Sequence, residues 1–330
     1  MPGWSRRELE DSLQCVRDEI VPHWDIHPEM VTHTLVIDPK TGRPFPERGD
    51  RFMENWRWTD GKSGPQLAEY LAYALRPLKH AGLPANGVTT PGGFANRSLP
   101  ALAEATLSAC RDVFATELPH YFRHVYEDGR SVAPRVELAK GLAGPQPQCV
   151  VSVVACVGDW FGGWDGLLVG SADKFLDRDG RRGRLPEIIA RGEPAVMICH
   201  WPGMYANGLE VGFNVLKDID ARLRPHADRT LWMKPSAIAR YWAAKELTAI
   251  AAAPGGFDLH APFATPDFTV ELRGPGGAPT VANDGAKAAT PLRRVAKPAD
   301  LVAGTYCPAG FERTLACFGL SKGRTELRRA

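Results

Sequence analysis

The chain has 330 residues, of which 44% are hydrophobic and 24% are charged, and its formal net charge is +2. These values are typical of a globular protein with a sizeable core, and so small a charge points to neither nucleic acid nor a membrane surface as the partner. No apolar stretch approaches the ~18 residues of a membrane span. The 7 cysteines are irregularly spaced, which favours a reducing compartment and predicts a cytoplasmic protein for the sequence as given.

Helices and short apolar strands alternate along most of the chain. A capping box at Ser5 begins a helix that ends before Pro22. Apolar residues at helical spacing predict further helices over 66–80, 98–114, 185–191, 209–223 and 236–250. The predicted strands are 29–37, 87–90, 135–138, 149–157, 195–199 and 231–233. The segment 149–157, CVVSVVACV, is apolar on both faces, as buried parallel strands are.

This alternation favours a parallel α/β fold. The chain has no GxGxxG or GxxxxGK[ST] loop, and polar clusters follow several different strands. We therefore expect an irregular, incomplete (β/α) barrel over residues 1–253 rather than an open sheet. From Pro254 onward Pro, Gly and alternating residues dominate, which predicts a small all-β appendage over 254–330. Within it we expect a Gly-rich loop near 274–290 and frayed residues at 323–330.

Four polar segments follow predicted strands or lead into one, where the rim of a barrel would gather them into one pocket. They are residues 25–33, TTPGGF (89–94), GDWFGGWDG (158–166) and CHWPGMYANG (199–208). The Pro-Gly-Gly of the second segment also suits a plain tight turn.

The segment GDWFGGWDG combines carboxylates, flat aromatic faces and glycines. Asp159, Trp160, Trp164 and Asp165 offer what a sugar-binding cleft needs, namely stacking surfaces beside hydrogen-bonding groups. The alternative is a Gly-rich turn whose Trp side chains pack into the core.

The segment CHWPGMYANG places His200 at the end of an apolar run. Its imidazole titrates near neutrality and suits a general acid or base. Trp201, Tyr205 and Asn207 add stacking and hydrogen-bonding groups for a substrate. A histidine satisfied within the core is the alternative interpretation.

The first segment contains candidate metal ligands in Asp25, His27 and His33. On a regular strand the two histidines would lie ~20 Å apart, so both can bind one ion only if the chain bends, for example at Pro28. Otherwise these groups are simply polar residues at the entry to a strand.

The order of these motifs resembles that of the polysaccharide deacetylases. EMVTHT (29–34) is similar to their His-Ser/Thr motif, TTPGGF to their Arg-x-Pro turn, GDW (158–160) to their Asp-Trp motif, and MICH (197–200) to their late Leu-x-His motif. The resemblance covers roughly residues 25–245. It implies a (β/α)7 barrel that removes acetyl groups from sugars with a divalent, zinc-like metal.

By this resemblance His33 is a metal ligand, His200 protonates the leaving group, and Asp159 orients His200 or binds substrate. His27 and Asp25 would replace ligands that the chain lacks, since the family's early strand with paired aspartates has no counterpart before Ser5. The family's second motif histidine is also absent, because Val36 and Ile37 stand there. We therefore expect that an N-terminal portion of the ancestral barrel is missing from this chain.

The sequence thus predicts a carbohydrate-active hydrolase of the deacetylase type, acting on a carbohydrate or another small molecule. Two alternatives remain open. One is a glycosidase that uses two carboxylates ~5–9.5 Å apart, with Asp159 and either Asp165 or Glu29 as candidates. The other is a barrel that binds glycan without turnover or has lost its ligand altogether. The sequence does not indicate whether the protein is a monomer or an oligomer.

Overall fold

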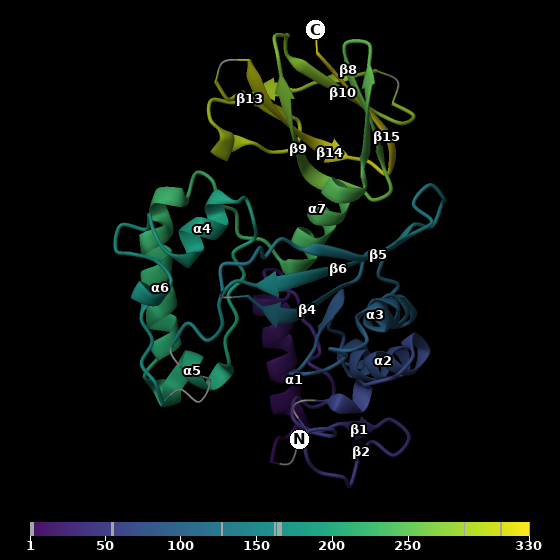
Figure 1. The fold of residues 1–330 in the computed structure, drawn as a ribbon, viewed down its shortest axis with the longest axis vertical. Coiled ribbons are helices and arrows are strands. Elements are labelled where there is room, and N and C mark those ends of the chain that lie inside the picture. The colour runs from purple at the N-terminus through teal and green to yellow at the C-terminus, as the bar shows by residue number, and fades with distance from the viewer. Residues whose placement is uncertain are drawn as a thin grey trace. The chain divides into compact units, whose positions relative to one another are not determined.

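The computed structural model describes residues 3–53, 56–126, 128–161, 163, 167–286, 288–310 and 312–329, and in them a mixed α/β fold with seven α-helices (Figure 1). The chain divides into two compact units. The first comprises Met1–His124, Pro134–Val153 and Met233–Ala239, and the second Val125–Ala133, Val154–Trp232 and Arg240–Ala330. None of the described helices is long and apolar enough to cross a membrane.

Three helices form the bulk of the first unit: α1 (Arg6–Cys15), which continues as a π-helix over Val16–Ile20, α2 (Gly64–His80) and α3 (Leu99–Phe114). The capping box of α1 is present, because Glu8 N donates to Ser5 Oγ and Ser5 N donates to the Glu8 carboxylate. Helices α2 and α3 lie side by side (Figure 1). Their apolar faces bury residues such as Leu67, Leu71 and Leu102, as the helical spacing predicts.

The sheet beside these helices has the strand order β3-β4-β6-β5. Its strands are β3 (Gly87–Thr89), β4 (His120–Val125), β5 (Arg135–Lys140) and β6 (Gln148–Ala155). Strands β3 and β4 pair in parallel, whereas β5 and β6 form an antiparallel hairpin. All residues of β6 after Gln148 are buried, in agreement with its apolar sequence. A separate short hairpin joins β1 (Ile37–Asp38) to β2 (Arg43–Pro44).

Three predicted strands are not regular strands in the described residues. Within 29–37 only Ile37 is in a strand, because Met30 takes a left-handed backbone (φ 60°) and turns the chain. Within 195–199 the pairing is a single parallel bridge between Met197 and Val157. Residues 231–233 form an irregular segment with exposed side chains. Short apolar runs carry little periodicity, so the pattern alone could not separate strand from irregular chain.

The described strands do not close into a barrel, so that expectation is not confirmed. The hairpin of β5 and β6 ends the parallel pairing at one edge of the sheet, and the later apolar segments do not extend it as ladders. What the structure supports is the coarser description of a mixed α/β protein.

Within the second unit, residues 154–232 surround an apolar core of their own. Its helices are α4 (Arg184–Ala190), α5 (Trp201–Tyr205) and α6 (Val211–Leu223). The core includes Trp160, Phe161 and Phe175. Gly203 in α5 permits the close approach of Phe161, because a Cβ at residue 203 would lie within 1.8 Å of that ring.

Helix α7 (Pro235–Leu247) leads into two sheets with the orders β11-β10-β15-β8-β7 and β12-β13-β14-β9. The strands are β7 (Ala249–Ala253), β8 (Gly256–Ala261), β9 (Thr265–Arg273), β10 (Pro279–Asn283), β11 (Thr290–Pro291), β12 (Arg293–Arg294), β13 (Thr305–Pro308), β14 (Arg313–Leu320) and β15 (Gly323–Arg329). Both sheets contribute to one apolar cluster that contains Leu259, Phe268, Phe318 and Leu327.

The all-β region therefore exists as predicted, but it begins before residue 254, because β7 follows α7 directly. The predicted Gly-rich loop near 274–290 contains strand β10. The segment that begins at Gly323 is the central strand β15 and is not frayed, since it pairs with both β8 and β10. Its alternation of arginines with Thr325 and Leu327 buries the apolar side and exposes the charged side.

Candidate metal centre

Three side chains that can ligate a metal converge in the first unit: Asp25, His27 and His120. One donor atom from each lies within 4.8 Å of the other two. Asp25 and His27 belong to the irregular segment after the π-helix, and His120 is the first residue of β4. The fold therefore joins a carboxylate and an imidazole from one short segment with a second imidazole, that of His120, which lies 93 residues after His27 in the chain.

Because Gly87 has no side chain, it leaves room for His120 where strands β3 and β4 lie close together. Gly87 of β3 lies opposite His120, and a Cβ at residue 87 would be 2.3 Å from the His120 carbonyl oxygen and 3.0 Å from its ring Nδ1. Any larger residue at position 87 would therefore push His120 out of place.

Hydrogen bonds with Thr89 and Ser236 hold the other two side chains in place. The Nδ1 of His27 is 3.3 Å from Thr89 Oγ1, and Thr89 N donates to the Pro28 carbonyl, so β3 holds both the ring and its backbone. The carboxylate of Asp25 accepts hydrogen bonds from Ser236 N (2.6 Å) and from Ser236 Oγ (2.8 Å).

Burial keeps both histidines neutral. It lowers the pKa of His27 to about 4, an effect that the nearby Asp25 charge partly opposes. It also lowers the pKa of His120 well below its usual value, with His27 adding to this and the Asn86 backbone opposing it. A neutral imidazole has a lone pair to offer a metal, whereas an imidazolium does not.

The buried ring nitrogens lack partners among the described residues. His27 Nε2 and both nitrogens of His120 are inaccessible to solvent and make no hydrogen bond there. Leaving a buried polar atom unsatisfied costs about 1–3 kcal/mol. An ion bound between these rings would coordinate one nitrogen of each ring, whereas a purely structural cluster leaves these nitrogens unexplained.

The donor set fits a divalent transition metal. Two imidazoles and one carboxylate are the protein ligands of many catalytic zinc sites, and the same set also suits Fe²⁺. The Nε2 of His120 lies 3.9 Å from Asp25 Oδ2, so an ion ~2.0–2.2 Å from each donor fits between them with small adjustments.

His33 lies outside this group. Its Nε2 is 3.3 Å from Glu29 Oε1, and its carbonyl accepts a hydrogen bond from the Trp56 indole. Of the three predicted ligands, the structure thus brings together Asp25 and His27 but not His33. The third member of the group is His120, which the sequence did not predict. The sequence offered one signal for His120: HYFRHV (120–125) directly after Pro119 has the aromatic and β-branched residues of a strand.

A second polar pair, Asp159 and His200, lies in the second unit. His200 Nδ1 is 2.8 Å from Asp159 Oδ1, which also accepts a hydrogen bond from His200 N (3.1 Å). Asp159 has a left-handed backbone (φ 38°), and His200 caps the start of α5. A carboxylate that holds an imidazole by Nδ1 is the usual way to orient a general acid or base. Next to them, burial raises the pKa of the Cys199 thiol to about 11, so this thiol is a poor nucleophile.

The predicted aromatic substrate residues separate into two kinds. Trp201 and Tyr205 are exposed, and their rings are parallel (7°) with centroids 5.9 Å apart. Asn207 is exposed in the turn after them. Trp160, by contrast, is buried in the core and its indole donates to the Gly212 carbonyl, which favours a packing role over substrate contact. Trp164 and Asp165 lie outside the described residues.

Comparison with family models, with curated proteins and with solved structures found no match to this chain. Functional inference therefore depends on the geometry of the sites.

Proposed function

We propose that this protein is a metal-dependent hydrolase that removes acyl groups from a sugar, with Asp25, His27 and His120 as metal ligands. The observation that carries the proposal is the convergence of these three side chains, among them two imidazoles with buried nitrogens that make no hydrogen bond within the described residues. A divalent ion, when bound, supplies Lewis-acid polarisation of a carbonyl and lowers the pKa of water.

The chain's own residues supply the remaining functions. Thr89 and Ser236 orient His27 and Asp25. His200, held by Asp159, is a separate candidate for a general acid or base, in the second unit. In that same unit, Trp201 and Tyr205 provide exposed faces on which a sugar ring can stack.

Metal analysis of purified variants tests this proposal. We expect about one zinc or iron per wild-type chain by elemental mass spectrometry, and release of acetate from acetylated chito-oligosaccharides or acetylated xylan. His27→Ala and His120→Ala should lose the metal and the activity, because each removes one of three ligands. His33→Ala is the matched control and should keep both. Retention of the full metal content by H120A would refute the assignment.

A glycan-binding protein without turnover is the second candidate, and the exposed Trp201–Tyr205 pair favours it. Binding to the same oligosaccharides by calorimetry, with no bound metal and no acetate released, would support it. Trp201→Ala should then abolish the binding.

A further inference from the structure

The start of α7 is tied to the segment that carries two of the proposed metal ligands. Lys234 Nζ donates to the Val21 carbonyl (2.7 Å), and Ser236 donates both its N–H and its hydroxyl to Asp25. All these residues belong to the first unit.

The geometry of α7 explains why Ser236 makes both bonds. Pro235 is the first residue of the helix and has no N–H, so the N–H of Ser236 is the first free donor of the helix start. The Asp25 carboxylate takes the place that a capping side chain would normally fill, and the positive end of the helix dipole favours its charge.

The two hydrogen bonds fix the carboxylate in one orientation. Ser236 Oγ engages Oδ1 and Ser236 N engages Oδ2, so the plane of the group cannot rotate without breaking both. In this orientation Oδ2 lies 3.9 Å from His120 Nε2, on the side where the ligands converge. The Asp25 side chain is only 7% exposed, so water offers little to replace a lost bond.

We propose that Ser236 is a positioning residue for the metal centre, and that its hydroxyl sets the metal affinity by holding Asp25 in its ligating orientation. This inference rests on the proposed metal site. Residues that orient metal ligands typically contribute 10–100-fold to metal affinity.

The test is the dissociation constant of Zn²⁺ and Co²⁺, measured by competition with a chromophoric chelator on the full chain. Ser236→Ala removes the hydroxyl and keeps the N–H, and it should weaken both metals by about 10–100-fold. It should also change the visible absorption of bound Co²⁺, which reports ligand geometry. Ser236→Thr keeps a hydroxyl and should restore affinity to near the wild-type value.

Ser63→Ala is the matched control. Ser63 also begins a helix, in the capping box of α2 with Gln66, but it does not contact the ligands. S63A should lower thermal stability to a similar degree as S236A while leaving metal affinity unchanged. If Ser236 had only a structural role, S236A and S63A would both lower thermal stability, and both would leave metal affinity unchanged.

The outcomes separate this inference from the proposed function. If the wild-type protein binds no metal, both are wrong. If it binds metal and S236A binds it equally well, the positioning role is wrong and the metal site stands. Should S236A fail to fold, S236T carries the test, because it keeps the hydroxyl and should bind both metals with affinity close to that of the wild-type protein. Weakened binding by S236T to the level of S236A would also overturn the role of the hydroxyl.

Discussion

His120 illustrates at the scale of single residues what burial does to an imidazole in this fold. The side chain is fully buried, its pKa lies well below the usual value because of that burial, and its ring nitrogens make no hydrogen bond within the described residues. An apolar residue could fill the same space without this cost. The role proposed for this ring, as a metal ligand together with His27 and Asp25, would account for this cost.

Gly87 leads to a prediction about His120. Gly87→Ala places a Cβ 2.3 Å from the His120 carbonyl oxygen, so the strands must shift and the ring must move. We expect a loss of about 1–3 kcal/mol in the free energy of unfolding, measured by urea denaturation, together with weaker Zn²⁺ binding.

Gly319→Ala is the control for this prediction. Gly319 is also in a strand, β14, but a Cβ there would meet nothing within 4 Å. Its stability and metal affinity should stay close to those of the wild-type protein. Equal behaviour of G87A and G319A would show that the close approach at His120 has no energetic weight.

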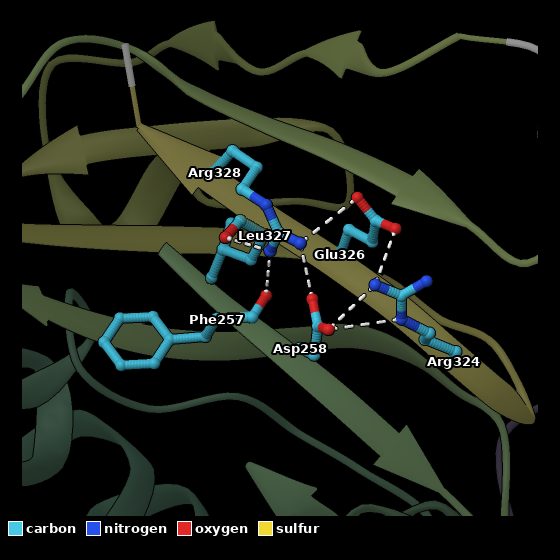
Figure 2. A network of polar contacts seen from close by, with 6 residues as sticks. All are labelled: Phe257, Asp258, Arg324, Glu326, Leu327 and Arg328. Atoms are coloured by element: carbon cyan, nitrogen blue, oxygen red, sulfur yellow. Dashed lines mark hydrogen bonds and ion pairs between the residues drawn. The ribbon is translucent and has the colours of Figure 1, made fainter. Parts of the chain in front are cut away.

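At the scale of elements, the pairing of β8 with β15 carries a ladder of charges on its outer side. Asp258 accepts hydrogen bonds from Arg328 (2.5 Å) and Arg324 (2.8 Å), and Glu326 pairs with the same two guanidinium groups (Figure 2). Arg328 also donates to the Phe257 carbonyl. Cross-strand pairs of opposite charge fix the register of the two strands.

This ladder predicts a pH dependence. The hydrogen bonds from Arg328 and Arg324 lower the pKa of Asp258. A carboxyl whose folded pKa is depressed stabilises the protein above its unfolded value of ~3.9, and this stability is lost as the pH falls through the folded value. Asp258→Asn should therefore unfold at a lower temperature than the wild-type protein at pH 7. The difference should disappear near pH 2.

Asp300→Asn provides the comparison for the pH series. Asp300 has one ion pair, with Lys297 at 3.9 Å, and both side chains are exposed. Its thermal unfolding should follow that of the wild-type protein at every pH, since exposed pairs contribute little. A D258N difference that persists unchanged at pH 2 would show that shape rather than charge holds the strands.

At the scale of the whole molecule, the proposed ligands all belong to the first unit, whereas the charge ladder belongs to the second. A ligand that binds only the folded state stabilises it by about 2.7 kcal/mol at a concentration 100 times its dissociation constant. A bound ligand stabilises only those segments that must unfold locally before the ligand can dissociate.

Hydrogen exchange can test this division. Saturating Zn²⁺ should increase amide protection over Val21–Pro28 and β4, and leave β14 and β15 unchanged. The H120A variant should show no response to Zn²⁺ in any of these segments. Protection that rises first in β14 and β15 would place the metal elsewhere.

Several elements follow from local sequence, because local interactions determine them. The capping box at Ser5, the apolar stripe of residues 66–80 and the doubly apolar run after Gln148 all specify their elements within a few residues. The all-β region after α7 was likewise visible in its composition. The prediction of a strand over 29–37 was wrong because one residue with a left-handed backbone, Met30, turns the chain. Methionine rarely adopts this conformation, so the sequence contains no signal for the turn.

The local sequence was enough to predict six of the seven described helices, the buried strand β6, the strands that follow α7, and two of the three converging side chains, Asp25 and His27. Only the tertiary structure decided the third ligand and the fate of the aromatic residues. The sequence pointed to His33 and gave no reason to choose His120. In the structure β3 and β4 pair in parallel, His120 lies close to Asp25, and His33 contacts Glu29. Trp160 and Trp201 are similar in sequence context, yet one fills a core and the other stands exposed. Long-range strand pairing and packing separate these pairs, because they depend on residues far along the chain that no local pattern contains.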